Sequence, residues 1–185
     1  MKLIRVLLLL SFTSLTVGCA ARSSDSYVDA YEDALLRYPG TAVSGPEVAD
    51  RFNSLYADLK GPDLAERIDE VYAEQIFFGD TLHTYHDRDE LRSYLILTAK
   101  RVDTIEVDVR HVVVDGHDVW LNWRMATSAK ALGKRMNAET IGMTHLRFDE
   151  QGKVVLHQDY WDSSEGVLIH IPIIGGLVRW TRNKL

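Results

Sequence analysis

The hydrophobic pattern of this chain changes its period near residue 103, and this change limits the possible folds more than any other feature. Upstream, apolar residues recur at helical spacing in three segments, as Val48, Phe52 and Leu55 do in the first. Downstream, four β-rich runs follow one another with turn signals between them. The helical segments span residues 45–60, 63–73 and 89–99, and the β-rich runs span 104–114, 119–128, 136–148 and 153–161. Helices followed by a series of hairpins predict an α+β fold with an antiparallel sheet.

The N-terminus has the features of an export signal. Lys2 and Arg5 flank the start of an apolar run, Val6–Val17, which is far shorter than the roughly 20 residues needed to cross a bilayer as a helix. The run ends in Thr16-Val17-Gly18-Cys19, which resembles the lipobox of bacterial lipoproteins. The resemblance implies that residues 1–18 are a lipoprotein signal peptide and that Cys19 becomes the acylated first residue of the mature chain, with palmitate-like chains.

Cys19 is the only cysteine, so it has no disulfide partner, and lipidation would account for an otherwise idle thiol. In lipoproteins of Gram-negative bacteria the next residue steers sorting, and Ala20 stands there instead of the Asp that favours the inner membrane. We therefore expect a cell-envelope protein anchored on the periplasmic face of the outer membrane. Residues 19–44 would form the tether, with a short helix near 27–38. An ordinary secreted protein, or an uncleaved anchor with an incidental cysteine, is the alternative.

Charge and length limit the partners of the mature chain. Loss of residues 1–18 leaves about 167 residues, which suits one domain with a sizeable core. Of these, 19 are basic and 27 are acidic. Nucleic-acid binding depends on Lys and Arg neutralising phosphates, so no nucleic acid is expected as a partner. The expected contact with the membrane is the lipid anchor.

Three short motifs resemble those of the nuclear-transport-factor-2-like fold, and in particular of SnoaL-like polyketide cyclases and ketosteroid isomerases. They are the hairpin 146–154 (LRFDEQGKV), the strand 157–162 (HQDYWD) and the segment 77–80 (FFGD). The resemblance implies a cone-shaped, strongly curved antiparallel sheet wrapped around about three N-terminal helices. It places this domain at residues 45–165 and implies a conical, largely apolar pocket inside it.

The same resemblance suggests which side chains line the pocket. Asp80 matches the general base of the isomerases, although it could equally bracket the polar loop that follows. On the last strand, the period of two puts His157, Asp159 and Trp161 on one face, and the match of Trp161 to a pocket-lining Trp turns that face inward. His157 and Asp159 would then form a polarised pair on the pocket wall, or a structural pair that fixes the strand end.

Other candidate lining residues weaken the match to isomerase chemistry. Thr144 stands where the isomerases carry a protonated Asp, and a hydroxyl is a much weaker acid than a carboxylic acid. Tyr56 lies one residue out of register with the second isomerase donor, and His83 would lie at the pocket mouth. Ketosteroid isomerase activity is therefore not assigned. No metal or cofactor is predicted, because the histidines lack the spacing and cysteine partners of recognisable sites.

Residues 166–185 extend the minimal cone by an apolar stretch and a short helix. We expect this C-terminal extension to pack on the domain; the alternative is that Trp180 and its basic neighbours lie on the bilayer surface. A convex sheet face bearing Leu156 and Tyr160 would suit a homodimer.

Two functional hypotheses follow. The first is a membrane-tethered module that binds a small apolar ligand, such as a lipid or isoprenoid fragment, because fold alone does not give catalysis. The second is a cofactor-independent isomerase, dehydratase or cyclase that uses Asp80 with His157 and Asp159. The second requires both carboxylates to share one pocket with the histidine.

Overall fold

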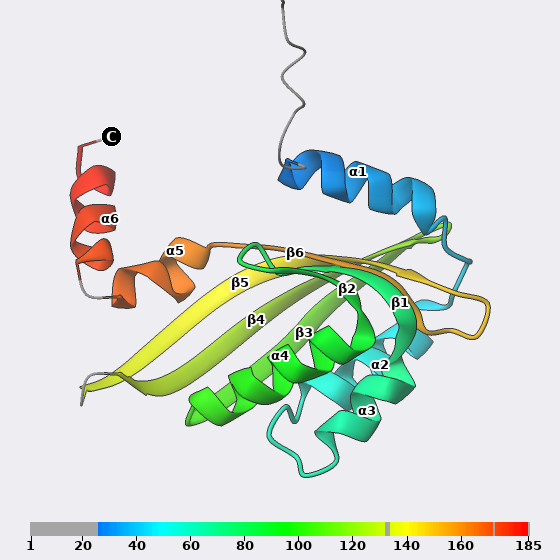
Figure 1. Ribbon diagram of the computed structural model, residues 1–185, viewed down its shortest axis with the longest axis horizontal. Coiled ribbons are helices and arrows are strands. Elements are labelled where there is room, and N and C mark those ends of the chain that lie inside the picture. The colour runs from blue at the N-terminus through cyan, green and yellow to red at the C-terminus, as the bar shows by residue number, and fades with distance from the viewer. Residues whose placement is uncertain (1–25, 132–133, 172, 185) are drawn as a thin grey trace, which may run out of the picture.

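The computed structural model describes residues 26–131, 134–171 and 173–184, so the expected signal peptide and Cys19 lie outside the described residues. Six strands form one curved sheet in the order β2-β1-β6-β5-β4-β3 (Figure 1). They are β1 (Tyr72–Gly79), β2 (Thr84–Asp87), β3 (Thr104–Asp115), β4 (Asp118–Ala131), β5 (Lys134–Phe148) and β6 (Val154–Trp161). The α+β fold predicted from the sequence is confirmed, with one refinement: β1 and β6 pair in parallel, whereas every other pair is antiparallel.

Strands β3, β4, β5 and β6 lie close to the predicted β-rich runs, because their alternating pattern is a local property of the sequence. The register from β3 to β4 and from β4 to β5 is nearly continuous, and its interruption at Val109/His111 bends the sheet. Strand β2 is absent from the sequence-based prediction, which placed these residues in a polar loop. Its four residues are an edge strand too short to show a period.

Three helices pack against the inner face of the sheet: α2 (Gly45–Tyr56), α3 (Leu64–Val71) and α4 (Arg88–Arg101) (Figure 1). Each contributes an apolar stripe to the main core, where Leu55, Ile68 and Leu91 are fully buried. The Asp87 side chain caps α4 by accepting from the Glu90 N–H at 2.9 Å. The pocket described below lies in the space between these helices and the strands.

Helix α1 (Tyr27–Arg37) packs on the opposite, outer face of the sheet (Figure 1). The Tyr31 hydroxyl lies 2.7 Å from His145 Nδ1, and His145 Nε2 lies 2.7 Å from Asp118 Oδ1. Arg147 donates from Nε to the same Asp118 oxygen at 2.6 Å. Leu156 of β6 is fully buried beneath this helix, where it packs against Ala34 of α1. Leu156 therefore does not lie on an open sheet face as expected, because α1 covers it, and the homodimer itself stays a prediction.

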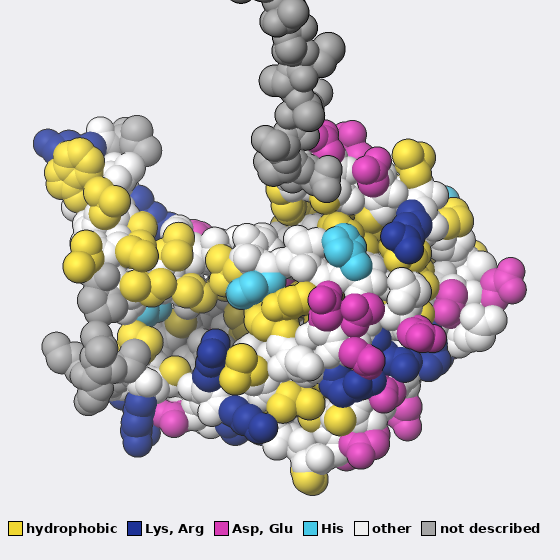
Figure 2. All heavy atoms as spheres, in the orientation of Figure 1, with side chains coloured by type: hydrophobic (Ala, Val, Ile, Leu, Met, Phe, Trp, Pro, Cys, Tyr) yellow, Lys and Arg dark blue, Asp and Glu magenta, His cyan; other side chains and the backbone are white. Residues whose placement is uncertain are grey.

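The chain ends in α5 (Ser163–Gly166), the 3-10 turn η1 (Leu168–His170) and α6 (Ile174–Arg182). Gly166 and Val167 line the pocket, whereas Leu177 and Trp180 of α6 are 61% and 59% exposed. Hydrophobic side chains gather over this end of the molecule in Figure 2. Within the described ranges, no helix is long and apolar enough to cross a membrane.

Candidate functional site

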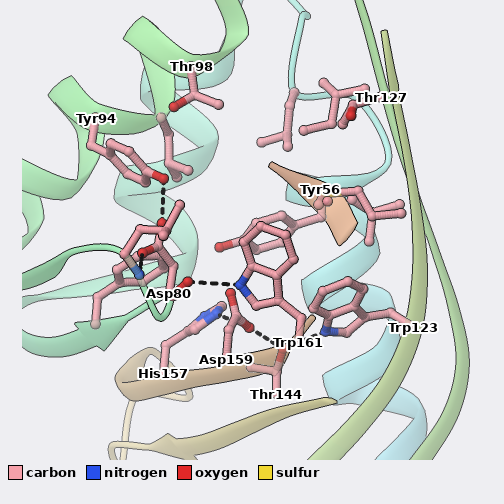
Figure 3. Close-up of a pocket in the computed structure, with 18 of the residues that line it drawn as sticks. Tyr56, Asp80, Tyr94, Thr98, Trp123, Thr127, Thr144, His157, Asp159 and Trp161 are labelled. Atoms are coloured by element: carbon pink, nitrogen blue, oxygen red, sulfur yellow. Dashed lines mark hydrogen bonds and ion pairs between the residues drawn. The ribbon is translucent and has the colours of Figure 1, made fainter. Parts of the chain in front are cut away.

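A pocket of about 240 Å³ lies between the inner face of the sheet and helices α2 and α4 (Figure 3). Most of its wall is aromatic or aliphatic. The aromatic part is formed by Phe52, Tyr56, Phe78, Tyr94, Trp123 and Trp161. The polar part is small and includes Asp80, Thr144, His157 and Asp159. An apolar cavity with a few convergent polar groups is the usual form of a small-molecule site.

The parallel pairing of β1 with β6 brings the two halves of the polar wall together. Phe78 pairs with His157 and Gly79 pairs with Gln158, so Asp80 emerges beside Asp159 at the strand ends. Trp161 strengthens this junction, because its indole Nε1 donates to the Asp80 backbone carbonyl at 2.8 Å. Three residues that the sequence singled out, Asp80, His157 and Asp159, thus line one pocket.

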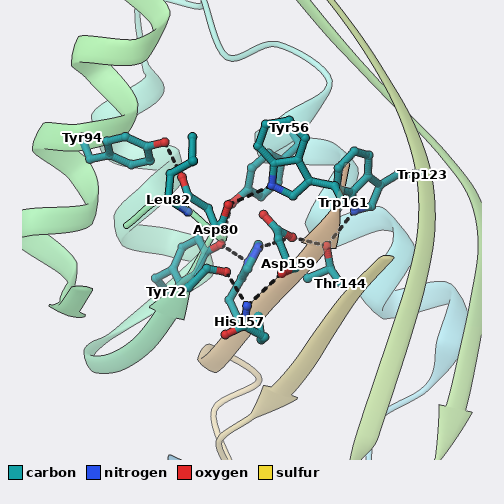
Figure 4. Close-up of polar contacts among 12 residues, drawn as sticks. Tyr56, Tyr72, Asp80, Leu82, Tyr94, Trp123, Thr144, His157, Asp159 and Trp161 are labelled. Carbon is teal, nitrogen blue, oxygen red and sulfur yellow. Dashed lines mark hydrogen bonds and ion pairs between the residues drawn. The ribbon is translucent and has the colours of Figure 1, made fainter. Parts of the chain in front are cut away.

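His157 is held from both ring nitrogens and is only 1% exposed. Its Nε2 lies 2.9 Å from Asp159 Oδ1, and its Nδ1 lies 2.7 Å from the Tyr72 hydroxyl (Figure 4). The Tyr72 hydroxyl in turn lies 2.6 Å from that of Tyr56. In the neutral tautomer that donates from Nε2 to the carboxylate, Nδ1 accepts from Tyr72, and Tyr72 accepts from Tyr56. The histidine therefore orients Asp159 through Nε2, and Tyr72 fixes the ring of the histidine through Nδ1.

Thr144 fixes the same carboxylate from the other side. Its hydroxyl donates to Asp159 Oδ1 at 2.5 Å and accepts from Trp123 Nε1 at 2.8 Å. Trp123 can lie flat there because its register partner is Gly142, where an added Cβ would come 2.4 Å from the indole ring. Both donors to Asp159 use Oδ1, and the other oxygen points into the pocket (Figure 3).

Asp80 lies at a tight turn between β1 and β2. Its Oδ1 accepts from the backbone N–H groups of Leu82 and His83, at 2.9 and 2.7 Å, and its Oδ2 accepts from the Tyr94 hydroxyl. The turn places Thr81 at φ 70°, a left-handed conformation that is rare for a β-branched residue. Such local strain is commonly found at functional positions, where the surrounding structure holds it in place.

Burial also sets the protonation of the tyrosines in the wall. Desolvation raises the pKa of Tyr56, and the nearby Asp159 raises it further. Desolvation and then Asp80 raise the pKa of Tyr94 in the same way. Both hydroxyls therefore stay neutral throughout the physiological range and act as hydrogen-bond donors rather than as bases.

The other candidates divide between wall and surface. Tyr56, Thr144 and Trp161 line the pocket. His83 lies outside its wall with its side chain 47% exposed, and its Nδ1 is 3.6 Å from Asp80 Oδ1. Among the described residues, no group of three or more His, Cys, Asp or Glu side chains is arranged to hold a metal ion.

Three residues of the candidate site were not named from the sequence: Tyr72, Tyr94 and Trp123. Tyr72 and Tyr94 look like ordinary core positions, since each carries an aromatic ring at helical spacing. Trp120 and Trp123 are three residues apart on one strand, a spacing that puts them on opposite faces of the sheet. The structure puts Trp123 in the pocket and stacks Trp120 on His145 on the outer face, with ring centroids 4.3 Å apart.

The curved sheet, the helices on its inner face and the pocket between them define a nuclear-transport-factor-2-like cone fold. Among the many solved structures that share it are the following three. A putative SnoaL-like polyketide cyclase from Jannaschia sp. CCS1 is 14% identical with a TM-score of 0.55, and the match covers 66% of this chain and 92% of that one. A protein of this fold from Exiguobacterium sp. 255-15 is 17% identical with a TM-score of 0.53, and the match covers 62% of this chain and 97% of that one. A hypothetical protein with a ketosteroid-isomerase-like fold from Catenulispora acidiphila, in complex with trimethylamine, is 16% identical with a TM-score of 0.56, and the match covers 67% of this chain and 92% of that one.

At these identities the structural matches show the fold alone. The model of the SnoaL-like domain family matches residues 52–157, which include most of the pocket wall. The chain therefore belongs to the SnoaL-like domain family, which comprises cofactor-independent isomerases and cyclases as well as ligand-binding proteins. Comparison with curated proteins finds no match.

Proposed function

We propose that this SnoaL-like domain binds a small, largely apolar molecule in the pocket between the sheet and helices α2 and α4. The observation that carries the proposal is the wall itself: six aromatic side chains surround a short polar patch at its inner end. Burying apolar ligand surface against such a wall supplies the driving force, and the polar patch orients the ligand.

The pocket volume restricts the size of the ligand. At about 240 Å³ it is below the roughly 300–1,000 Å³ of sites that take drug-sized molecules. A whole lipid or a long isoprenoid would therefore enter only in part. The fitting ligand is a small molecule, or the end of a longer one.

The ligand proposal can be tested by native mass spectrometry of protein expressed with its N-terminal segment. We expect a small molecule to remain bound to the native chain and to be lost from Thr98→Phe, which fills the pocket from α4. Leu97→Phe is the matched control, because this neighbouring side chain is exposed and lies outside the pocket. Recovery of no ligand from the native chain, or equal recovery from both variants, would contradict the proposal.

We also propose that the protein is tethered at the periplasmic face of the outer membrane through an acylated Cys19. The support is the lipobox-like end of the apolar run, and the consequence is a pocket held close to a source of apolar molecules. Metabolic labelling with an alkynyl fatty acid should label the native chain, and Cys19→Ser should abolish the label. Labelling that survives this substitution would refute the anchor.

A second candidate function, acid–base catalysis without a cofactor, is favoured by one observation: Asp80, Asp159 and the buried His157 line the same pocket. In such an enzyme Asp159 would take a proton from the ligand while His157 holds the carboxylate in place. The molecule recovered by mass spectrometry can be incubated in D₂O with the protein. Exchange of a carbon-bound proton by the native chain, lost in Asp159→Asn while binding persists, would establish catalysis. Binding without proton exchange or conversion of the ligand would refute catalysis and support binding as the function.

A further inference from the structure

We infer that the ligand of this pocket carries a positive charge and is a small organic ammonium ion with apolar substituents. This inference rests on the proposed function, that the pocket binds a small molecule. It depends on three properties of the wall: its charge, its free hydrogen-bonding groups and its aromatic faces.

The formal charge of the wall is negative. Among the described residues that line the pocket are two carboxyl groups, Asp80 and Asp159, and neither Lys nor Arg. The one lining histidine, His157, lies against Asp159, so the wall remains negative whether this ring is neutral or protonated. Outside the wall, His83 approaches Asp80, but its side chain is half exposed to water. An anionic ligand would meet two carboxylates without a counter-ion, whereas a cation would supply the missing charge.

The inner end of the pocket offers acceptors rather than donors. Trp123 Nε1 donates to Thr144, Thr144 donates to Asp159, and Trp161 Nε1 donates to the backbone of Asp80. The hydroxyls of Tyr94 and Tyr56 are likewise engaged, with Asp80 and with Tyr72.

Asp159 Oδ2, in contrast, receives no donor from the described part of the chain. The hydroxyls of Thr98 and Thr127 lie at the far end of the pocket (Figure 3). A ligand that reaches the inner end must therefore supply a donor or a positive charge to this oxygen. A neutral hydrocarbon would instead remove water from Oδ2 and leave it without a partner.

The aromatic walls suit the same kind of ligand. Trp161 and Trp123 flank the carboxylate of Asp159, and Tyr56 and Phe78 also line the pocket (Figure 4). The face of an aromatic ring attracts a cation, and cages of such rings bind alkylated ammonium groups. Methyl or other alkyl substituents on the nitrogen would at the same time bury apolar surface against these rings.

The test compares two isosteric probes by isothermal titration calorimetry: choline, and 3,3-dimethylbutan-1-ol, in which carbon replaces the charged nitrogen. We expect choline to bind roughly tenfold or more tightly, since the alcohol leaves the carboxylate uncompensated. Asp159→Asn keeps the shape of the side chain and removes its charge, and it should weaken choline binding by a similar factor. Asp162→Asn is the matched control, because this exposed residue pairs with Arg182 and lies outside the pocket.

The outcomes distinguish the inference that the ligand is a cation from the proposal that the pocket binds a small molecule. Equal or tighter binding of the neutral isostere would overturn the inference and leave the proposed function intact. Recovery of a neutral or anionic molecule by native mass spectrometry would likewise overturn the inference and leave the proposed function intact. Failure of both probes to bind would also overturn it, and if no molecule co-purified either, the proposed function would fall as well. The comparison on the native chain remains decisive even if Asp159→Asn does not fold.

Discussion

Replacing Thr144 by Val removes one oxygen atom on which two other groups of the site depend. The side chain is fully buried, and its hydroxyl links Trp123 Nε1 to Asp159 Oδ1. Valine has almost the same shape, so the backbone and the packing of β5 should be retained. The indole N–H would lose its acceptor, and the carboxylate would lose one of its two donors.

The expected cost follows from these two losses. A buried donor left without a partner costs about 1–3 kcal/mol, and a lost hydrogen bond to a charged group costs about 1.5–3 kcal/mol. Water can replace part of the second, because the Asp159 side chain is 18% exposed. We therefore expect the free energy of unfolding to fall by about 2–4 kcal/mol. For a domain of this size that corresponds to a decrease in Tm of roughly 5–15 °C.

Urea unfolding followed by far-UV circular dichroism would measure the loss, with two control variants. Thr144→Ser keeps the hydroxyl and should lose only about 1 kcal/mol for the missing methyl group. Thr140→Val alters a buried threonine on the same strand whose hydroxyl has one long contact, 3.4 Å, with a backbone carbonyl. If Thr144→Val were no more destabilising than Thr140→Val, the link between Trp123 and Asp159 would not stabilise the site as described.

Three further predictions concern other parts of the molecule. Gly142→Ala should destabilise the fold by about 1–3 kcal/mol in urea unfolding, since the new methyl group meets the indole of Trp123; a loss below 0.5 kcal/mol, on the order of experimental error, would contradict this. Burial lowers the pKa of His145, so below about pH 6.5 the unfolded chain binds more protons than the folded one and the free energy of unfolding should decline. The urea midpoint of the native chain should therefore drop between pH 7 and pH 5, and it should drop less in His145→Gln. Trp180→Ala should change the free energy of unfolding by less than about 0.5 kcal/mol, because this side chain is mostly exposed.

Much of the fold could be predicted because it depends on local patterns. Alternation of apolar and polar residues identified β3, β4, β5 and β6, and helical spacing identified α2, α3 and α4. Strand β2 could not be predicted in this way, since four polar residues at an edge carry no period. The burial of His145 was also missed: the pattern of β5 shows two alternating faces but does not show that α1 covers the outer one.

For the candidate site, the residue types and the strand face that each shares can be read from the chain alone. The two-residue spacing of His157 and Asp159 requires that both side chains lie on the same face of the strand. The resemblance to SnoaL-like proteins indicated that this face lines the pocket. The contacts that these residues make depend instead on the folded arrangement of the strands. The pairing of β1 with β6 joins segments far apart in the chain and brings Asp80 to Asp159, and the register of β5 on β6 sets Thr144 opposite the same carboxylate. The first contact depends on the pairing of two strands that are far apart in the chain, and no local pattern in the sequence specifies the register of that pair. The second depends on a hairpin whose register shifts at Arg147/Phe148. In either pair, a shift of one residue would turn every side chain to the opposite face.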